Sequence, residues 1–162
     1  ADVWVRRDAP DLFAAVPPGH IGVSVADALD PHGLLPRFAR QMAEVCGSQG
    51  VPVPPGADRT HWNSGLVVVR PGHAAYWAPP VNPLPKHWVA EELLSKAHTF
   101  RAGWPLFDLP HPAVHWQWWR DREWSALGPP LPAFVHPAGL TQQPNGLQRR
   151  LDLFRFLEAS GV

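Results

Sequence analysis

The sequence has little that would connect it to a membrane, to nucleic acid or to an oxidising compartment. Its 162 residues include a single cysteine, Cys46, which excludes an internal disulfide and fits a reducing compartment. No apolar run approaches the roughly 18 to 20 residues that a transmembrane helix needs. Charged residues make up only 17% of the chain and its formal net charge is zero, so nothing favours a nucleic-acid partner. We expect a soluble, cytoplasmic protein without a transmembrane segment.

Proline, glycine and tryptophan are plentiful instead. The 21 Pro and 13 Gly predict many loops and short elements, whereas a hydrophobic fraction of 45% is enough for a packed core. The length fits one domain. Periodicity predicts strands at 1–6, 21–25, 66–69 and 133–136 and an extended piece at 104–110. It predicts helices over 8–16, 34–45, 86–97 and 147–157, with Gly47 as the C-cap of the second.

The stretch from His61 to Pro71 is the most informative part of the chain. Residues 66–69 are Leu and Val without polar alternation, as in a central strand buried on both faces. Asn63, Ser64 and Gly65 precede this run, and a residue without a Cβ lets a ligand come close. These residues predict either the edge of a binding site or a tight polar turn that enters a core strand.

Residues 62–71 resemble the "NSG, apolar strand, RP" signature of the family 8, glycogenin-like nucleotide-diphospho-sugar glycosyltransferases. The resemblance implies the GT-A fold, a Rossmann-like α/β fold, and places Asn63, Ser64 and Gly65 at the donor. It covers residues 1–162 as the C-terminal, metal and acceptor side of one such domain. We therefore expect the family's N-terminal nucleotide-binding part to be missing from this segment, and the isolated segment to be inactive.

Two further matches imply a metal site. The start, Ala1 to Val5, is similar to the tail of the family's Asp-x-Asp element, with Asp2 as the second carboxylate. Residues 134–140 are similar to its C-terminal "H-x-x-G-x-x-K" element, with His136 as a metal ligand. Carboxylate oxygen suits Mn²⁺ or Mg²⁺, and an imidazole nitrogen is acceptable to Mn²⁺. Taken without the resemblance, an Asp near a chain end is more often plain surface.

The same C-terminal element implies contacts with the donor diphosphate. Gly139 would let the backbone approach a phosphate. The chain departs from the family at Gln142, where a Lys is usual, and a neutral amide cannot supply that charge. Either Arg149 or Arg150 substitutes for the Lys, or phosphate is held more weakly.

A third match concerns Glu91 and Glu92, which fall where the family has an acidic or amide pair near the anomeric carbon. Consecutive helical residues project about 100° apart, so at most one of the two can face a site. We keep both as catalytic candidates, although a Glu pair on a helix is usually a solvated face.

Two functions from different classes follow. The first, which the resemblance implies, is a metal-dependent transfer of a sugar, expected to be retaining, from a nucleotide-diphosphate donor to a hydroxyl group of a saccharide or another acceptor. The second is a non-catalytic, Trp-rich saccharide-binding or scaffold domain, because residues 115–119 hold three Trp that either pack together or stack on sugar rings.

Overall fold

The computed structural model has a mixed α/β fold with small sheets, which confirms the α/β class expected from the sequence. The chain divides into two compact units, one made of Ala1–Ala15 and Leu109–Val162 and the other of Val16–Asp108. The residues that the structure describes are 3–25, 33, 35–62, 65–109, 115–117, 131–137 and 144–159.

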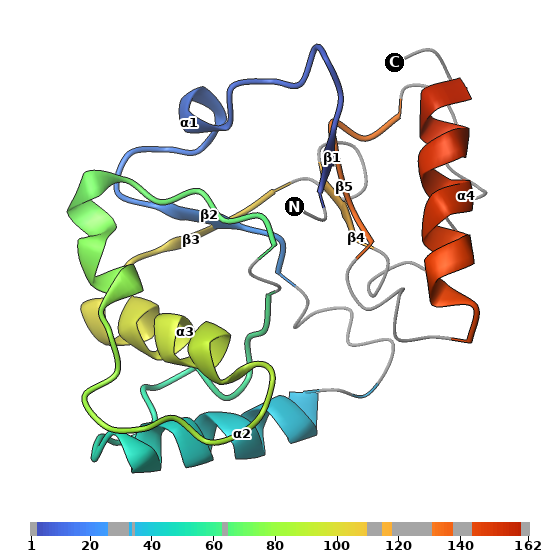
Figure 1. The fold of residues 1–162 in the computed structure, drawn as a ribbon. Helices are drawn as coiled ribbons and strands as arrows, with labels where there is room; N and C mark the ends of the chain where they lie inside the picture. Colours follow the sequence, from blue (N-terminus) through green and yellow to red (C-terminus); the bar gives the residue numbers. More distant parts are fainter. Residues whose placement is uncertain are drawn as a thin grey trace. The chain divides into compact units, whose positions relative to one another are not determined.

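The first unit contains a three-stranded sheet with β5 in the middle (Figure 1). β5 (Phe134–His136) pairs antiparallel with β1 (Trp4–Val5) and parallel with β4 (His115–Gln117). The strands predicted at 1–6 and 133–136 are confirmed, although each is shorter than expected. A one-turn helix, α1 (Leu12–Ala15), begins after Asp11, whose Oδ1 accepts a hydrogen bond from the backbone N–H of Phe13 at 2.8 Å.

The helix predicted over 147–157 is confirmed as α4 (Gly146–Ala159). The apolar positions that predicted this helix included Leu147 and Leu151, but these two residues are not on its buried face. Leu147 and Leu151 are exposed, whereas Leu153 and Leu157, one turn apart, lie in the core. The buried core of this unit, against which Trp4, Phe154 and Phe156 pack, consists of Leu131, Val135, Leu153 and Leu157.

The second unit has β2 (Ile21–Val23) at its centre, and all three of its residues are buried. β3 (Leu106–Asp108) pairs parallel with β2. Val68 forms an isolated antiparallel bridge with Gly22, with N···O distances of 3.0 and 2.8 Å. Gly22 is the close-approach glycine of this unit, because a Cβ there would lie 2.6 Å from Val16 Cγ2.

The predicted central strand at 66–69 is wrong. Only Val68 of this run makes a bridge and only Val68 is buried, while its neighbours are half-buried. The fully buried strand is β2 instead. Periodicity could not distinguish residues 66–69 from residues 21–23. A short apolar run has the same sequence pattern whether it forms a strand within a sheet or only packs beside one.

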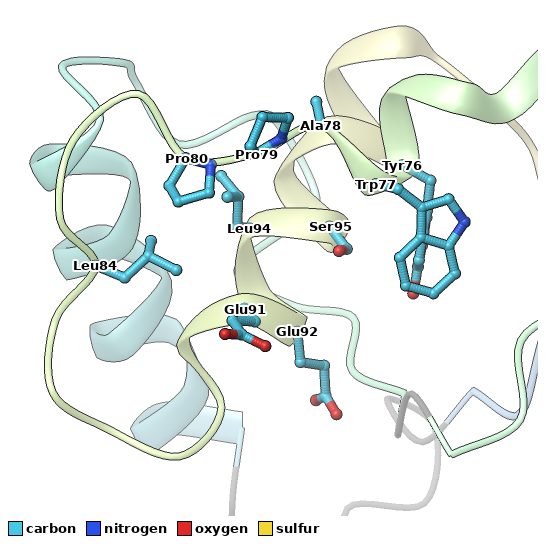
Figure 2. A pocket seen from close by; sticks show the side chains of 10 residues that line it. All are labelled: Tyr76, Trp77, Ala78, Pro79, Pro80, Leu84, Glu91, Glu92, Leu94 and Ser95. Carbon is cyan, nitrogen blue, oxygen red and sulfur yellow. The ribbon is translucent and has the colours of Figure 1, made fainter.

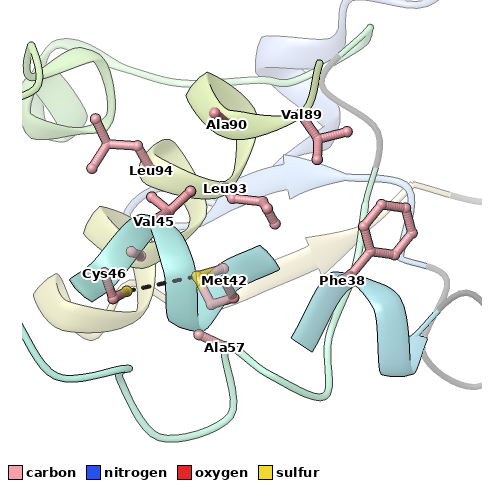
Figure 3. Packing of buried hydrophobic residues seen from close by; sticks show 10 residues of the cluster. Phe38, Met42, Val45, Cys46, Ala57, Val89, Ala90, Leu93 and Leu94 are labelled. Carbon is pink, nitrogen blue, oxygen red and sulfur yellow. Dashed lines mark hydrogen bonds between the residues drawn. The ribbon is translucent and has the colours of Figure 1, made fainter. Parts of the chain in front are cut away.

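Two helices that pack against each other form the largest core (Figure 3). They are α2 (Leu35–Ser48) and α3 (Ala90–Ala102), and both were expected from periodicity. α2 continues past the predicted end, so Gly47 lies inside the helix and is not its C-cap. Gly50, with φ of 67°, is the left-handed residue that follows. The buried residues are Phe38, Met42, Val45, Cys46, Ala57, Val89, Ala90, Leu93, Leu94 and Ala97.

Arg70 and Pro71 start a 3-10 helix, η1 (Pro71–Trp77), which the sequence did not predict. Arg70 Nη2 donates to the Val16 carbonyl at 2.9 Å, and its backbone N–H donates to His73 Nδ1 at 3.2 Å. Proline at the first helical position is favourable because the amide it lacks would have no helical partner. None of the helices formed by the described residues is both long and apolar enough to span a membrane.

Candidate functional site

The first turn of α3 carries Glu91 and Glu92, and one turn later comes Lys96. Residues four apart lie on one face of a helix, so Glu92 and Lys96 meet there. Lys96 Nζ lies 2.7 Å from Glu92 Oε1, and the two side chains are 0% and 9% exposed. An ion pair this deeply buried is costly to desolvate, and it depends on further polar contacts.

His61 supplies such a contact. Its Nδ1 lies 2.6 Å from Lys96 Nζ, so the ammonium donates to a neutral imidazole. The ring stacks on Phe38 with centroids 3.6 Å apart and an interplanar angle of 11°. Burial, followed by the charge of Lys96, holds the pKa of His61 well below its usual value. The imidazole therefore stays neutral near pH 7.

Lys96 itself is completely enclosed. Burial lowers its pKa to about 8, against the opposing effect of the Glu92 carboxylate. Its Nζ also lies 5.2 Å from the centroid of the Trp62 ring and 5.8 Å from that of Phe38. Within about 6 Å a ring face attracts a cation, so both rings help to hold the ammonium group.

A cavity of about 270 Å³ lies between the end of η1 and the start of α3, as Figure 2 shows. Both Glu91 and Glu92 line it. The expectation that at most one of them faces a catalytic site stays a prediction. The two side chains project in different directions from α3, and both reach the cavity wall. The other lining residues are Tyr76, Trp77, Ala78, Pro79, Pro80, Leu84, Leu94 and Ser95.

The Tyr76 hydroxyl is a buried polar group in that wall. Neither it nor the buried indole nitrogen of Trp62 makes a hydrogen bond of normal geometry within the part of the chain that the structure describes. Burial raises the pKa of Tyr76 to about 12; the Trp62 N–H opposes this effect and the Glu92 carboxylate adds to it. The hydroxyl therefore remains protonated near pH 7, and it is enclosed beside the Trp62 N–H.

Most of the other predicted site residues lie outside the described residues. They are Asp2, Asn63, Ser64, Gly139 and Gln142. Gly65 is described and is exposed in a turn. His136 ends β5, where the structure describes its backbone. The assignments of these residues to a donor or a metal stay predictions.

The strand register bears on the two predicted metal ligands. Trp4 lies opposite Val135, and Val5 lies opposite Phe134. If this antiparallel register continues by one residue, Val3, the residue after Asp2, comes opposite His136. Directly opposed residues in such a pair have Cα atoms about 4.5 to 5.5 Å apart. Among the described side chains, no three His, Cys, Asp or Glu residues cluster as metal ligands.

Sequence reasoning missed the cluster behind Glu92. The spacing of Glu92 and Lys96 is visible in the sequence as a helical ion pair, but such pairs are usually solvated. His61 was part of the motif that drew attention, yet no local pattern indicates that it meets Lys96, 35 residues further along the chain.

No protein-family model matches the chain, and no curated protein or solved structure matches it either. The function of the chain is therefore inferred from its residues and from the geometry described above.

Proposed function

We propose that the chain belongs to a nucleotide-diphospho-sugar glycosyltransferase with the GT-A fold, one that transfers a sugar to a hydroxyl acceptor with retention. The motif resemblances around Asp2, Asn63 to Gly65 and His136 support this proposal. The observation that carries it is the β1–β5 register. β1, the strand that follows the motif at Asp2 in the sequence, pairs antiparallel with β5, which ends at His136.

Asp2 and His136 are the residues of this chain that would hold Mn²⁺ or Mg²⁺. One carboxylate and one imidazole fit Mn²⁺ better than Mg²⁺, which prefers oxygen alone. When bound, the cation would offset the charge that develops on the departing diphosphate. Gly139 and the segment around Gln142 would lie against that diphosphate.

Glu92 is the better of the two catalytic candidates. Its carboxylate lines the cavity, and the ion pair with Lys96 fixes its direction. A fixed carboxylate beside a sugar can stabilise positive charge at the anomeric carbon, provided it is oriented before the reaction begins. Glu91 is exposed and would contact the acceptor or the sugar hydroxyls.

A saccharide-binding domain without catalysis is the second candidate. Trp77 is 65% exposed and lines the same cavity, as expected for a side chain that stacks on a sugar ring. Saccharide binding of this kind needs no metal and no nucleotide, so a binding measurement without either distinguishes it from the glycosyltransferase function.

Calorimetric titration tests the proposal. The full-length protein that carries this segment is titrated with uridine, guanosine and thymidine diphospho-sugars with and without Mn²⁺, in parallel with the isolated segment, which should bind no donor. The variants are Asp2→Asn and His136→Ala, and His20→Ala is the matched control because His20 lies outside all these motifs. We expect donor binding only with Mn²⁺, and a loss of Mn²⁺ affinity of at least about ten-fold in each of the two ligand variants, comparable to losses at metal sites in general.

Binding of a donor without Mn²⁺, or Mn²⁺ affinity unchanged by both ligand substitutions, would overturn the metal assignment. Absence of donor binding together with binding of free saccharides would favour the second candidate. In crystals grown with Mn²⁺, the Asp2 carboxylate and the His136 imidazole should both lie within about 2.0–2.6 Å of the ion. A separation of the two side chains above about 10 Å would exclude a shared ion.

A further inference from the structure

The cavity between η1 and α3 has a size and a chemistry that restrict its ligand. Its volume of about 270 Å³ is at the lower limit of the roughly 300–1,000 Å³ typical of small-molecule sites. A single sugar-sized ring fits this volume, whereas a complete nucleotide sugar does not. The apolar part of the wall comes mainly from prolines and leucines at the end of η1 and on α3.

Two aromatic rings form one side of the cavity. The rings of Tyr76 and Trp77 are close to perpendicular, with centroids 4.7 Å apart and an interplanar angle of 77°. Figure 2 shows both side chains at the end of η1. The two rings pack edge to face on each other, and Tyr76 is only 1% exposed, so the ring face that a cation can approach is that of Trp77. The exposed Trp77 leaves a ring face accessible to a ligand.

Carboxylates provide the other side. Glu92 is compensated by Lys96, but Glu91 makes no hydrogen bond or ion pair with any residue that the structure describes. None of the ten residues that line the cavity is Lys, Arg or His. The net charge of the lining is therefore negative, which disfavours a phosphate and favours a cation.

One hydroxyl group adds a polar position, because the Ser95 side chain lines the cavity. The Tyr76 hydroxyl is enclosed beside the Trp62 N–H, so a ligand in the cavity does not reach it. A ligand with hydroxyl groups as well as a positive charge matches the whole lining.

We propose that this cavity binds an amino sugar, with its ammonium group between the Glu91 carboxylate and the Trp77 ring and a ring hydroxyl at the Ser95 side chain. The binding claim depends only on the cavity. The role of the amino sugar as acceptor rests on the proposed glycosyltransferase function, and it would name the acceptor class of that enzyme.

The test is calorimetric titration of the protein with D-glucosamine, without metal and without donor. Glucose and N-acetylglucosamine are the neutral analogues with the same ring. We expect glucosamine to bind at least about ten-fold more tightly than either analogue, because only glucosamine offers an ammonium group to Glu91 and Trp77. The affinity should fall as the pH rises and the amine loses its proton.

Variants locate the site. Glu91→Gln and Trp77→Ala should each weaken glucosamine binding by about ten-fold or more, since each removes one of the two groups that face the ammonium. Tyr76→Phe should leave glucosamine binding unchanged, because the hydroxyl it removes is enclosed and a ligand in the cavity does not reach it. Glu158→Gln, an exposed carboxylate on α4, is the matched control and should bind like the parent protein.

Equal affinity for glucose and glucosamine would overturn the ammonium assignment. Binding of glucosamine that Glu91→Gln and Glu158→Gln weaken equally would show a general charge effect and would also overturn it. Because no metal or nucleotide is present, failure here leaves the Mn²⁺-dependent donor binding untouched. Failure of donor binding, in turn, leaves the amino-sugar site standing.

Discussion

Lys96 and Glu92 form an ion pair that is almost completely enclosed in the second unit, with Nζ 2.7 Å from Oε1. His61 and the rings of Trp62 and Phe38 surround the ammonium group. The pair lies between the core of α2 and α3, where Lys96 Nζ is 5.8 Å from the Phe38 ring centroid, and the cavity wall, which Glu92 lines. Its properties lead to the first two predictions.

Lys96→Met should lower the free energy of unfolding by about 3–5 kcal/mol, because it leaves the carboxylate of Glu92 buried without its partner. Lys96→Met combined with Glu92→Gln should recover part of this loss, since no uncompensated charge remains. Urea unfolding followed by tryptophan fluorescence measures both. A single variant as stable as the double variant would show that the pair does not hold Glu92.

The stability of the protein should decrease in acid because of His61. The folded state keeps this imidazole neutral and lowers its pKa, whereas the unfolded chain binds a proton below about pH 6.5. The unfolded state then holds more protons, so the free energy of unfolding falls as the pH drops through 6.5, by at most about 1.4 kcal/mol per pH unit for one group.

His61→Asn isolates this contribution, since Asn does not titrate. The pKa of His98 is also lowered by burial, so the His61→Asn variant should retain some acid sensitivity of the same sign from that residue. The difference between parent and variant in urea unfolding, measured from pH 5 to pH 8, should grow toward low pH. A difference independent of pH would contradict the neutral state of His61.

Gly22→Ala should destabilise the second unit by about 1–3 kcal/mol, as overpacking does in general. The new Cβ would lie 2.6 Å from Val16 Cγ2 and 3.0 Å from Val68 Cβ. Gly47→Ala is the matched control and should stabilise by about 0.5–1 kcal/mol, because Gly47 lies inside α2 with open space around it. Thermal unfolding should move the two melting temperatures in opposite directions.

Cys46 should react with thiol reagents only when the second unit opens. It is buried and burial raises its pKa, so the reactive thiolate is scarce in the folded state. Because the chain has no other cysteine, the rate of thiol labelling measures that opening directly. Labelling should be faster in Lys96→Met than in the parent protein, and fast labelling of the native parent would contradict the burial of Cys46.

The sequence by itself determined the elements that depend on local information. Apolar spacing located α2, α3 and α4, because side chains three and four residues apart share a helix face whatever lies opposite. Alternation of side chains at residues 1–6 located β1, and a short run between Pro132 and Pro137 located β5. The ends of elements were less well predicted. For example, α2 continues through Gly47 to Ser48, and there is open space around Gly47. Which residues surround Gly47 is decided by the tertiary structure, so no local pattern reveals it.

Only the tertiary structure decided which apolar segment became the central strand and which polar residues meet. Residues 66–69 and 21–23 are both short and apolar, and the close approach allowed by Gly22 places β2 in the middle with Val68 as its bridging partner. Likewise, His61 and Lys96 come into contact only because α3 packs against the segment that carries His61. Such long-range contacts are fixed by the free energy of packing the whole unit, and so the buried cluster behind Glu92 could not be deduced from spacing along the chain.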